Sequence, residues 1–388
     1  MLINFSFLKS EKDFLSLIDY LFLLLYHSFM SQTKKRVIIV LSCVLFAFLY
    51  IILAFQFPGE ELQFIPHWTV SVTKQSENLS VTKKQFPFKL GQNLGYFSED
   101  GEILMAESFP YMATISNDAW SIFSSSAENT PFFDENKTKI GEIPLAGFPF
   151  FTEFEKFIFL PGGMSFCQLN EDGTPLWTYE DVTPITSFYP YDNGVIVGFA
   201  EGKIINFDSK GNILFSIAPG GSNYSVILGA AASSDGTISA CVSGLNQQRF
   251  VLMKTAGGQT KTVFHEYLTG DLREQTYVKF AKDDTKVFYN EKNGLGVVDI
   301  IELKSFHLPL TGKILAIEEM EELNLFFVLT KTEGKDNASN VYRVYIVEDL
   351  CNLIGSFSFY ANNAFILADG NNLYTGSNTT ISKIEVTK

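Results

Sequence analysis

Residues 194–217 read GVIVGFAEGKIINFDSKGNILFSI, and this stretch decides the fold class of the 388-residue chain. It divides into three apolar runs, VIVGF, KIINFD and ILFSI, separated by turn sequences at 200–202 and 209–211. Short connections that contain Gly, placed between alternating apolar runs, are typical of tight turns between antiparallel strands. The stretch therefore predicts a meander of three antiparallel strands.

One sequence pattern within this stretch recurs along the chain. It consists of an acidic residue, a turn Gly and an apolar residue four positions beyond that Gly. It is clearest in EDGEILM at Gly101, EDGTPLW at Gly173 and DSKGNILF at Gly211. Weaker versions lie near residues 137, 257, 304 and 352. The spacing of these centres, about 36 to 48 residues, is the length of one four-stranded propeller blade.

Seven repeat centres predict an all-β fold, a seven-bladed β-propeller over residues 67–388, with six or eight blades as alternatives. Successive sheets packed around an axis bury apolar faces that no single sheet could bury alone. We expect the last hairpin, residues 364–386, to be completed by a strand that follows Trp68, such as WTVSVT. A two-sheet sandwich is the competing fold, but it lacks a period near 40 residues.

At these phrases the chain resembles the quinoprotein-like (PQQ-like) and WD40-like propellers, which include bacterial outer-membrane-assembly propellers and the YVTN group. In the quinoprotein-like repeat, a Trp four residues after the turn Gly docks between blades. Gly173 with Trp177 matches this pattern fully, whereas Gly211 with Phe215 matches it in spacing alone. The resemblance covers most of residues 65–388 and implies a fold. A function must be argued from a site.

Residues 37–57, VIIVLSCVLFAFLYIILAFQF, contain no charged side chain and are long enough as a helix to cross a bilayer core of about 30 Å. The basic run at 34–36 directly precedes them, so the positive-inside rule places the N-terminus in the cytoplasm. We expect a cytoplasmic segment at 1–36, an uncleaved signal-anchor helix at 37–57, a linker at 58–66 and an extracytoplasmic domain at 67–388. A cleaved signal peptide and a buried core helix are the alternatives.

Residues 1–29 allow two interpretations. The run from 14 to 29 is apolar but short and contains Asp19, so it could form an interfacial helix. Met30, followed by SQTKKR and the apolar run, has the form of an ordinary protein start. We expect translation to begin at Met30, and the orientation of the domain is the same in either case.

The charge is concentrated outside the N-terminal segment. Residues 1–57 hold five basic and three acidic residues, so the net charge of −14 leaves −16 on the remainder. A domain this acidic repels a phosphate backbone, and we expect no nucleic-acid partner. The surplus of acids either keeps the domain soluble or forms a surface for a partner.

A search for chemistry yields no catalytic, metal-binding or cofactor-binding residue. The four His (His27, His67, His265 and His307) show no metal-ligand spacing, and the chain lacks a G-x-S-x-G elbow and a phosphate-binding P-loop. Cys167, Cys241 and Cys351 lie far apart in strand-like runs, so we expect no disulfide. Quinoprotein dehydrogenases use a pair of adjacent cysteines, which this sequence lacks, and we expect no quinone.

The leading hypothesis is a non-enzymatic scaffold, anchored in the inner (cytoplasmic) membrane, that binds a protein partner in the cell envelope. Propeller faces are broad and carry variable loops, which suits protein docking. The alternative is an extracytoplasmic hydrolase or lyase with carboxylates or a metal at the central channel. Three or more carboxylates or His in the channel would favour the enzyme, whereas a mouth lined by Phe and Gly would favour the scaffold.

Overall fold

The computed structural model describes residues 32–54, 61–74, 84–270, 272–334 and 339–388. Two compact units result, with the division between Glu61 and Leu62. The first unit contains the helix α2 (Gln32–Ala54), and the second contains every described strand.

The helix α2 covers most of the apolar run that we assigned to a membrane anchor, and residues 55–57 of that run lie outside the described residues. Apolar side chains such as Leu41, Val44 and Tyr50 are exposed along it. Among the described residues, no helix meets the combined length and hydropathy of a membrane span. Residues 1–29 also lie outside the described residues.

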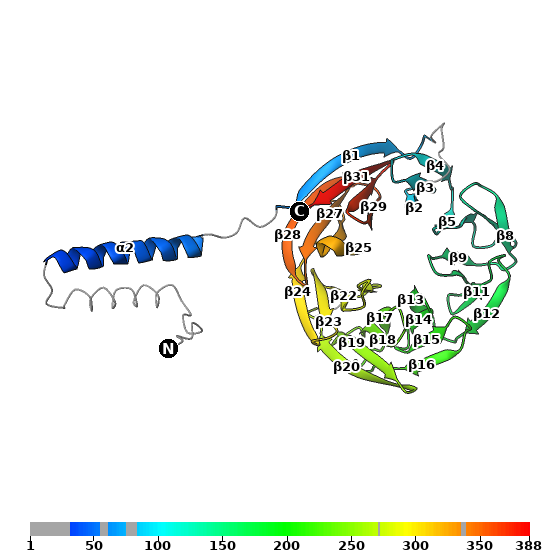
Figure 1. The fold of residues 1–388 in the computed structure, drawn as a ribbon. Coiled ribbons are helices and arrows are strands. Elements are labelled where there is room, and N and C mark those ends of the chain that lie inside the picture. The colour runs from blue at the N-terminus through cyan, green and yellow to red at the C-terminus, as the bar shows by residue number, and fades with distance from the viewer. Residues whose placement is uncertain (1–31, 55–60, 75–83, 271, 335–338) are drawn as a thin grey trace. The chain divides into compact units, whose positions relative to one another are not determined.

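The second unit is a ring of eight antiparallel sheets, or blades, around a central opening (Figure 1). Seven blades follow one another along the chain. Their strands are β2 (Gln85–Leu90), β3 (Asn93–Ser98) and β4 (Ile103–Ser108); β5 (Met112–Ile115), β6 (Trp120–Phe123), β7 (Thr130–Phe133) and β8 (Lys139–Ile143); β9 (Phe148–Phe151), β10 (Lys156–Phe159), β11 (Ser165–Leu169) and β12 (Pro175–Glu180); β13 (Ile185–Tyr191), β14 (Gly194–Phe199), β15 (Ile204–Asp208) and β16 (Ile213–Ile217); β17 (Ile227–Ala232), β18 (Ile238–Ser243), β19 (Arg249–Ala256) and β20 (Gln259–Tyr267); β21 (Val278–Phe280), β22 (Lys286–Glu291), β23 (Gly294–Asp299) and β24 (Lys304–Pro309); and β25 (Lys313–Met320), the 3₁₀ turn η1 (Glu321–Leu323), β26 (Leu325–Thr332), β27 (Asn340–Glu348) and β28 (Asn352–Ala361).

The eighth blade closes the ring by combining the two ends of the domain. It has the order β1-β31-β30-β29, where β1 (Gln63–Ser71) is the outer strand and β29 (Ala364–Asp369), β30 (Asn372–Ser377) and β31 (Thr380–Thr387) come from the C-terminus. The pairing joins Gln63 to Thr387 at one end and Ser71 to Thr380 at the other. This confirms the predicted completion of the last hairpin. The strand begins within the segment 58–66 that we assigned to a linker.

The predicted count of seven blades is wrong, because the ring has eight. Each of the seven repeat centres lies at the turn between the two outermost strands of a blade, as Gly173 does between β11 and β12. In the closing blade these two strands are β31 and β1, which no turn connects because they lie at opposite ends of the domain. A repeat defined by that turn therefore cannot detect the eighth blade.

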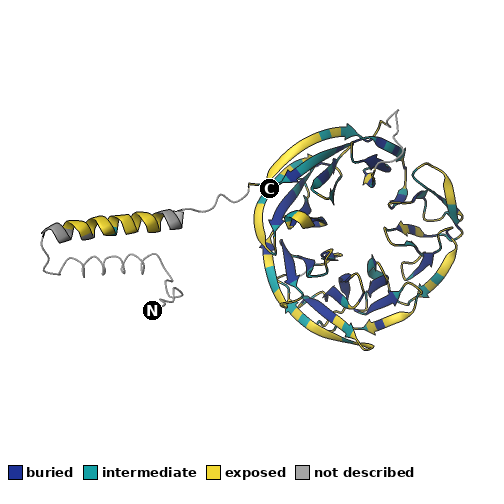
Figure 2. Ribbon diagram, in the orientation of Figure 1, coloured by how far each residue is buried: buried dark blue, intermediate teal, exposed yellow. Residues whose placement is uncertain are grey.

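Burial follows strand position within each blade (Figure 2). All six residues of β14, GVIVGF, are buried, because a second strand has a neighbour on each side and a blade packed against each face. The outer strand β12, PLWTYE, is mostly exposed instead. Apolar runs in the sequence therefore mark inner strands, and alternating runs mark the rim.

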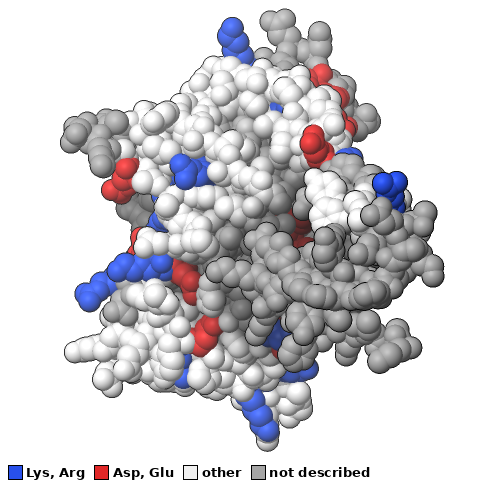
Figure 3. Space-filling view, turned by 90° about the vertical axis from the view of Figure 1, so that its left-hand side faces the viewer, with Lys and Arg blue, Asp and Glu red and all other residues white. Residues whose placement is uncertain are grey.

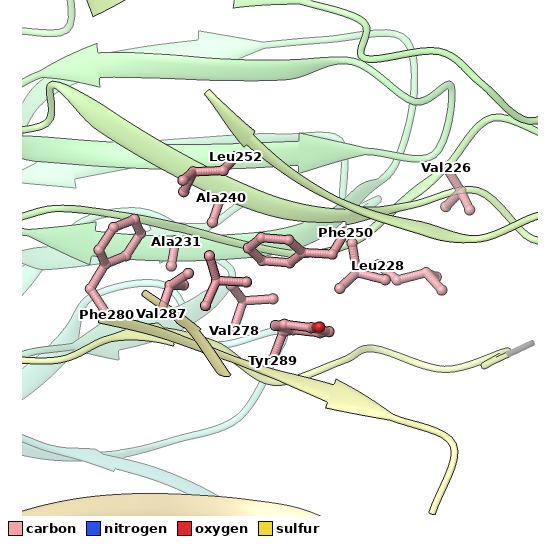
Figure 4. Packing of buried hydrophobic residues seen from close by; sticks show 12 residues of the cluster. Val226, Leu228, Ala231, Ala240, Phe250, Leu252, Val278, Phe280, Val287 and Tyr289 are labelled. Atoms are coloured by element: carbon pink, nitrogen blue, oxygen red, sulfur yellow. The ribbon is translucent and has the colours of Figure 1, made fainter. Parts of the chain in front are cut away.

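Blades are joined by aromatic and aliphatic side chains packed between neighbouring sheets. Between the blades β17–β20 and β21–β24, the rings of Phe250 and Tyr289 stack with centroids 4.2 Å apart (Figure 4). Leu228 and Val278 belong to the same cluster. Cys167 and Cys241 are buried free thiols within strands, whereas Cys351 lies exposed in the turn at 349–351 rather than in the strand that we expected.

Candidate binding face and channel cavity

The ring has two faces that are built from different connections. In a four-stranded blade, the turns from first to second strand and from third to fourth strand end on one face, and in the three-stranded blade β2-β3-β4 the outer turn at 99–102 ends on the same face. The turns from second to third strand and the crossings to the next blade end on the other face, which we call the loop face. Backbone hydrogen bonds link connections within one face, such as Ile185 N to Gly163 O and Leu245 N to Tyr224 O on the loop face.

The first of these faces, which we call the acidic face, carries most of the excess charge. In the described ranges, its turns hold 18 Asp and Glu against three Lys, a formal net charge of −15. The acids are Glu99, Asp100, Glu102, Asp118, Asp134, Glu135, Glu153, Glu155, Glu171, Asp172, Asp192, Asp235, Asp283, Asp284, Glu302, Glu321, Glu322 and Asp349, and the bases are Lys137, Lys210 and Lys282. Several acids accept hydrogen bonds from their own turn, as Asp235 does from Thr237 N at 2.9 Å. The acidic residues of the repeat therefore serve largely to stabilise the turns in which they lie.

The loop face is nearly free of net charge and exposes apolar side chains. Its described turns and crossings, with residues 72–74 and 84 left out of the count, contain five acids (Glu128, Asp181, Glu201, Glu274 and Glu333) and three bases (Lys203, Arg273 and Lys292). Val182, Tyr111 and Tyr224 are 86%, 75% and 65% exposed. Tyr267 and Tyr360, at the loop-face ends of β20 and β28, are also exposed.

Exposed aromatic side chains with few charges are the composition of the central part of protein interfaces. The side view of Figure 3 shows blue and red side chains scattered over a mostly uncharged surface, some of them side by side. The charge imbalance of the domain therefore belongs to the turns of the acidic face, and the loop face has the chemistry of a binding surface.

A partly buried cluster of one Lys and two acids links two connections of the loop face. Lys203 Nζ contacts Asp181 Oδ2 at 2.8 Å and Glu201 Oε1 at 2.6 Å, which ties the crossing 181–184 to the turn 200–203. Burial acts to raise the pKa of Asp181, but hydrogen bonds from Lys203, Tyr179 and the backbone of the crossing outweigh it and lower that pKa to about 2. The exposed Val182 directly follows Asp181, the residue that these contacts hold to the turn 200–203.

A cavity of about 420 Å³ opens in the channel wall, where the chain enters the inner strands from the loop face. Four successive blades build it, through β9, β10, β13, β17 and the crossing that leads into β21. Its wall is mainly aromatic and aliphatic, including Phe150, Phe159, Phe188, Tyr189 and Leu228. The rings of Phe159 and Phe188 meet edge to face at 4.8 Å, so this wall is held in place by ring packing.

Polar groups also line the cavity. Gln275 Nε2 donates to Thr186 O at 2.9 Å and fixes the crossing across the mouth. The hydroxyl oxygens of Thr186 and Thr276 are buried and have no hydrogen-bond partner in the described structure. Thr276 is 9% exposed, and its Oγ1 lies 2.4 Å from the position that a Cβ on Gly229 would occupy. Buried hydroxyls without partners are uncommon and call for an explanation.

Charged side chains in this part of the channel are few. Lys279 lines the cavity and its Nζ donates to Ile317 O at 2.8 Å. Glu318, on the neighbouring strand β25, accepts from Ala368 N at 3.2 Å. Burial raises the pKa of Glu318, against the opposing effect of Lys279, and Glu153 adds to the increase. Burial likewise raises the pKa of Tyr189 to about 12.

The structure brings no predicted chemical group together with this cavity. His67 contacts Glu385 at 2.6 Å, and His307 contacts Glu291 at 3.0 Å, both away from the cavity lining. His27 lies outside the described residues. Within the ranges that the structure describes, no group of three or more His, Cys, Asp and Glu is arranged to hold a metal ion. The cavity wall contains Phe, as the scaffold hypothesis expects of the channel mouth, but Tyr, Thr and Ser stand where that hypothesis expects Gly.

Sequence reasoning missed the cavity, since its residues come from five separate segments with no common spacing. One signal was available. In the crossing at 272–277, Thr276 and Tyr277 directly precede a short apolar strand, and inner strands of a propeller line its channel.

The fold defines the class of the protein, an eight-bladed β-propeller. The chain belongs to the family described as beta-propeller protein, whose model matches residues 30–388. An "uncharacterized protein" of Treponema pallidum (strain Nichols) is 26% identical over 367 residues, which cover 92% of this chain and 96% of that protein.

Solved structures show the same fold at low sequence identity. The structure of BamB from Moraxella catarrhalis is similar with a TM-score of 0.53 and 13% identity, covering 78% of this chain and 99% of that one. The computationally designed Ika8 protein is similar with a TM-score of 0.55 and 13% identity, covering 78% of this chain and 95% of that one. At such identity the likeness concerns the fold alone.

Proposed function

We propose that this protein is a membrane-anchored, extracytoplasmic scaffold that binds a protein partner of the cell envelope through its loop face. The observation that carries the proposal is the contrast between the two faces. Nearly all of the excess charge lies on the acidic face, whereas the loop face exposes Tyr111, Val182 and Tyr224 around an aromatic cavity. Exposed aromatic side chains in a surface of low net charge are energetically productive contacts for a protein partner.

The membrane anchor rests on the sequence 37–57 and on the basic run before it. In the described part of α2, apolar side chains such as Val40, Leu45 and Phe48 are exposed, which a lipid environment would cover. The resemblance of the repeats to those of outer-membrane-assembly propellers supports a role in the envelope.

The proposal is tested by capture from crosslinked membranes with two matched triple variants. In the first, Tyr111, Tyr224 and Tyr360 of the loop face are replaced by Ser. In the second, the exposed apolar residues Phe154, Ile301 and Leu303 of the acidic face are replaced by Ser. The control is a protein that keeps residues 1–61 and lacks the propeller. We expect the wild type and the second variant to enrich one envelope protein over this control, and the first variant to lose it. Equal recovery with both variants would contradict the proposal.

A further inference from the structure

We infer that the channel cavity is an anchor site that takes up one large apolar side chain, Trp, Phe or Leu, from an extended segment of the partner protein. The inference rests on the proposed function and deepens it by naming the chemistry of the bound group. It is argued from the size of the cavity, its wall, its position and its unpartnered hydroxyls.

The size and lining of the cavity suit a side chain of a protein. Cavities of about 300–1,000 Å³ with mainly apolar walls are typical of ligand sites. The cavity here, at about 420 Å³, has room for one aromatic side chain and part of its backbone. Phe150, Phe159 and Phe188 provide ring faces and edges for such a group. Phe150 is 38% exposed, so it can be covered further by an incoming group.

The position of the cavity favours a protein segment over a free small molecule. The cavity lies at the loop-face end of the channel, on the face that carries the exposed Tyr side chains. A partner that covers this face can therefore place one side chain into the channel while its flanks contact Tyr224 and Val182. Such an arrangement, a buried anchor surrounded by contacts that exclude water, is common where proteins bind one another tightly.

Charge selects against other occupants. The wall contains a single formal charge, Lys279, whose ammonium already donates to Ile317 O. A cationic side chain, such as that of Lys or Arg, would lose its hydration without gaining an ion pair, which is unfavourable. The hydroxyls of Thr186 and Thr276 are closed off from solvent and have no partner, so a peptide N–H or C=O beside the anchor would bond them once their side chains rotate toward the cavity.

The first test measures binding of the probe N-acetyl-5-fluorotryptophanamide to the full chain by ¹⁹F NMR, with N-acetyl-lysinamide as the charged comparison. The variant Ser187→Phe places a ring in the cavity, and Ser216→Phe makes the same change on the exposed outer strand β16. We expect saturable, millimolar binding of the indole probe, retained in Ser216→Phe and abolished in Ser187→Phe. Binding that is equal in both variants, or absent from the wild type, would overturn the inference.

The second test uses an isosteric change that leaves the cavity shape intact. Thr276→Val replaces an unpartnered hydroxyl by a methyl group, whereas Thr114→Val removes a hydroxyl that accepts from Phe151 N at 2.9 Å. We expect Thr276→Val to keep or raise the melting temperature while weakening the captured complex by roughly three- to tenfold. Thr114→Val should lower the melting temperature without changing the affinity of the folded protein. Unchanged affinity in Thr276→Val would show that the Thr276 hydroxyl does not bond the bound segment.

The outcomes separate this inference from the proposed function. If loop-face variants lose the partner but Ser187→Phe still binds it, the scaffold stands and the anchor site falls. If Ser187→Phe and the loop-face variants both lose the partner, both proposals stand. If neither loses it, both fall.

Discussion

The indole of Trp177, on the outer strand of one blade, lies against Gly211 in the outer turn of the next blade. A Cβ built on Gly211 would stand 2.6 Å from Cδ2 of Trp177, and the indole N–H donates to Ser209 O at 3.3 Å. The same relation recurs where the ring closes, since a Cβ on Gly101 would stand 2.7 Å from Cδ2 of Trp68, whose N–H donates to Glu99 O at 3.2 Å. These two contacts join neighbouring blades through side chains that the sequence places far apart.

The substitution Gly211→Ala tests this contact. We expect it to lower the free energy of unfolding by about 2–4 kcal/mol, from a positive φ and from overlap with the indole. Gly220→Ala is the control, because Gly220 also has a positive φ but nothing within 4 Å of the added Cβ, so a loss of about 1 kcal/mol is expected. Urea denaturation measures both. Equal losses in the two variants would mean that the indole does not press on Gly211.

The closing strand gives a second prediction. A chain that begins at Leu62 keeps β1, whereas a chain that begins at Val72 exposes the edge of β31 and loses Trp68. We expect the first to unfold in one cooperative transition as a monomer. The chain that begins at Val72 should have a melting temperature lower by about 10 °C or more, or should associate through the open edge of β31. Circular dichroism and size-exclusion chromatography distinguish these outcomes, and indistinguishable behaviour would show that β1 does not close the ring.

The pair formed by Asp181 and Lys203 predicts a defined pH dependence. Because the pKa of Asp181 is lowered from 3.8 to about 2 in the folded state, its contribution is present above pH 3.8 and is lost as the pH falls through about 2. Asp181→Asn should therefore cost about 1–2 kcal/mol at pH 7, and the difference from wild type should shrink below pH 3.8.

Urea unfolding of both proteins at pH 7, 5 and 3 checks this dependence. Asp192→Asn, at an exposed turn of the acidic face, provides the control and should change the unfolding free energy by less than about 0.5 kcal/mol. A cost of Asp181→Asn that stays constant across the pH range would mean that the ion pair is not its cause.

The predicted anchor and start site can be tested together. The full chain should remain with membranes after extraction with alkaline carbonate, and a chain that begins at Leu62 should not. N-terminal mass spectrometry of the native protein should find Met30, or the residue after it, at the start. Recovery of the full chain in the soluble fraction, or of peptides from residues 1–29, would contradict the respective prediction.

The repeat phrase was sufficient to predict the propeller and the closing strand, because turn Gly and alternating apolar residues are local signals. It was not sufficient for the blade count, since the outer strands of the closing blade are not adjacent in sequence. Trp68 occupies the same position as Trp177 in its blade, but the Gly-to-Trp pattern could not identify it, because no turn Gly lies four residues before it. Residues 144–147, PLAG, form the crossing between two blades, and nothing in their own sequence indicates on which face of the ring this crossing lies.

The cavity could not be predicted for a related reason. Phe150, Phe188 and Leu228 come from three blades, and only ring closure brings them to one wall. Likewise, the acids of the EDG turns are evident in the sequence, but their collection on one face depends on the direction of every strand. Local chemistry was therefore predictable, and its distribution over the two faces was not.

Site-specific photo-crosslinking in living cells tests the central claim most directly. A photoreactive amino acid is placed at Tyr224 or Val182 on the loop face, and at Lys210 or Glu302 on the acidic face. All four positions lie exposed in turns or crossings, where we expect a larger side chain to be accommodated. Our account predicts that one protein partner is crosslinked from both loop-face positions and from neither acidic-face position. Crosslinking of the partner from the acidic face, with none from the loop face, would contradict it.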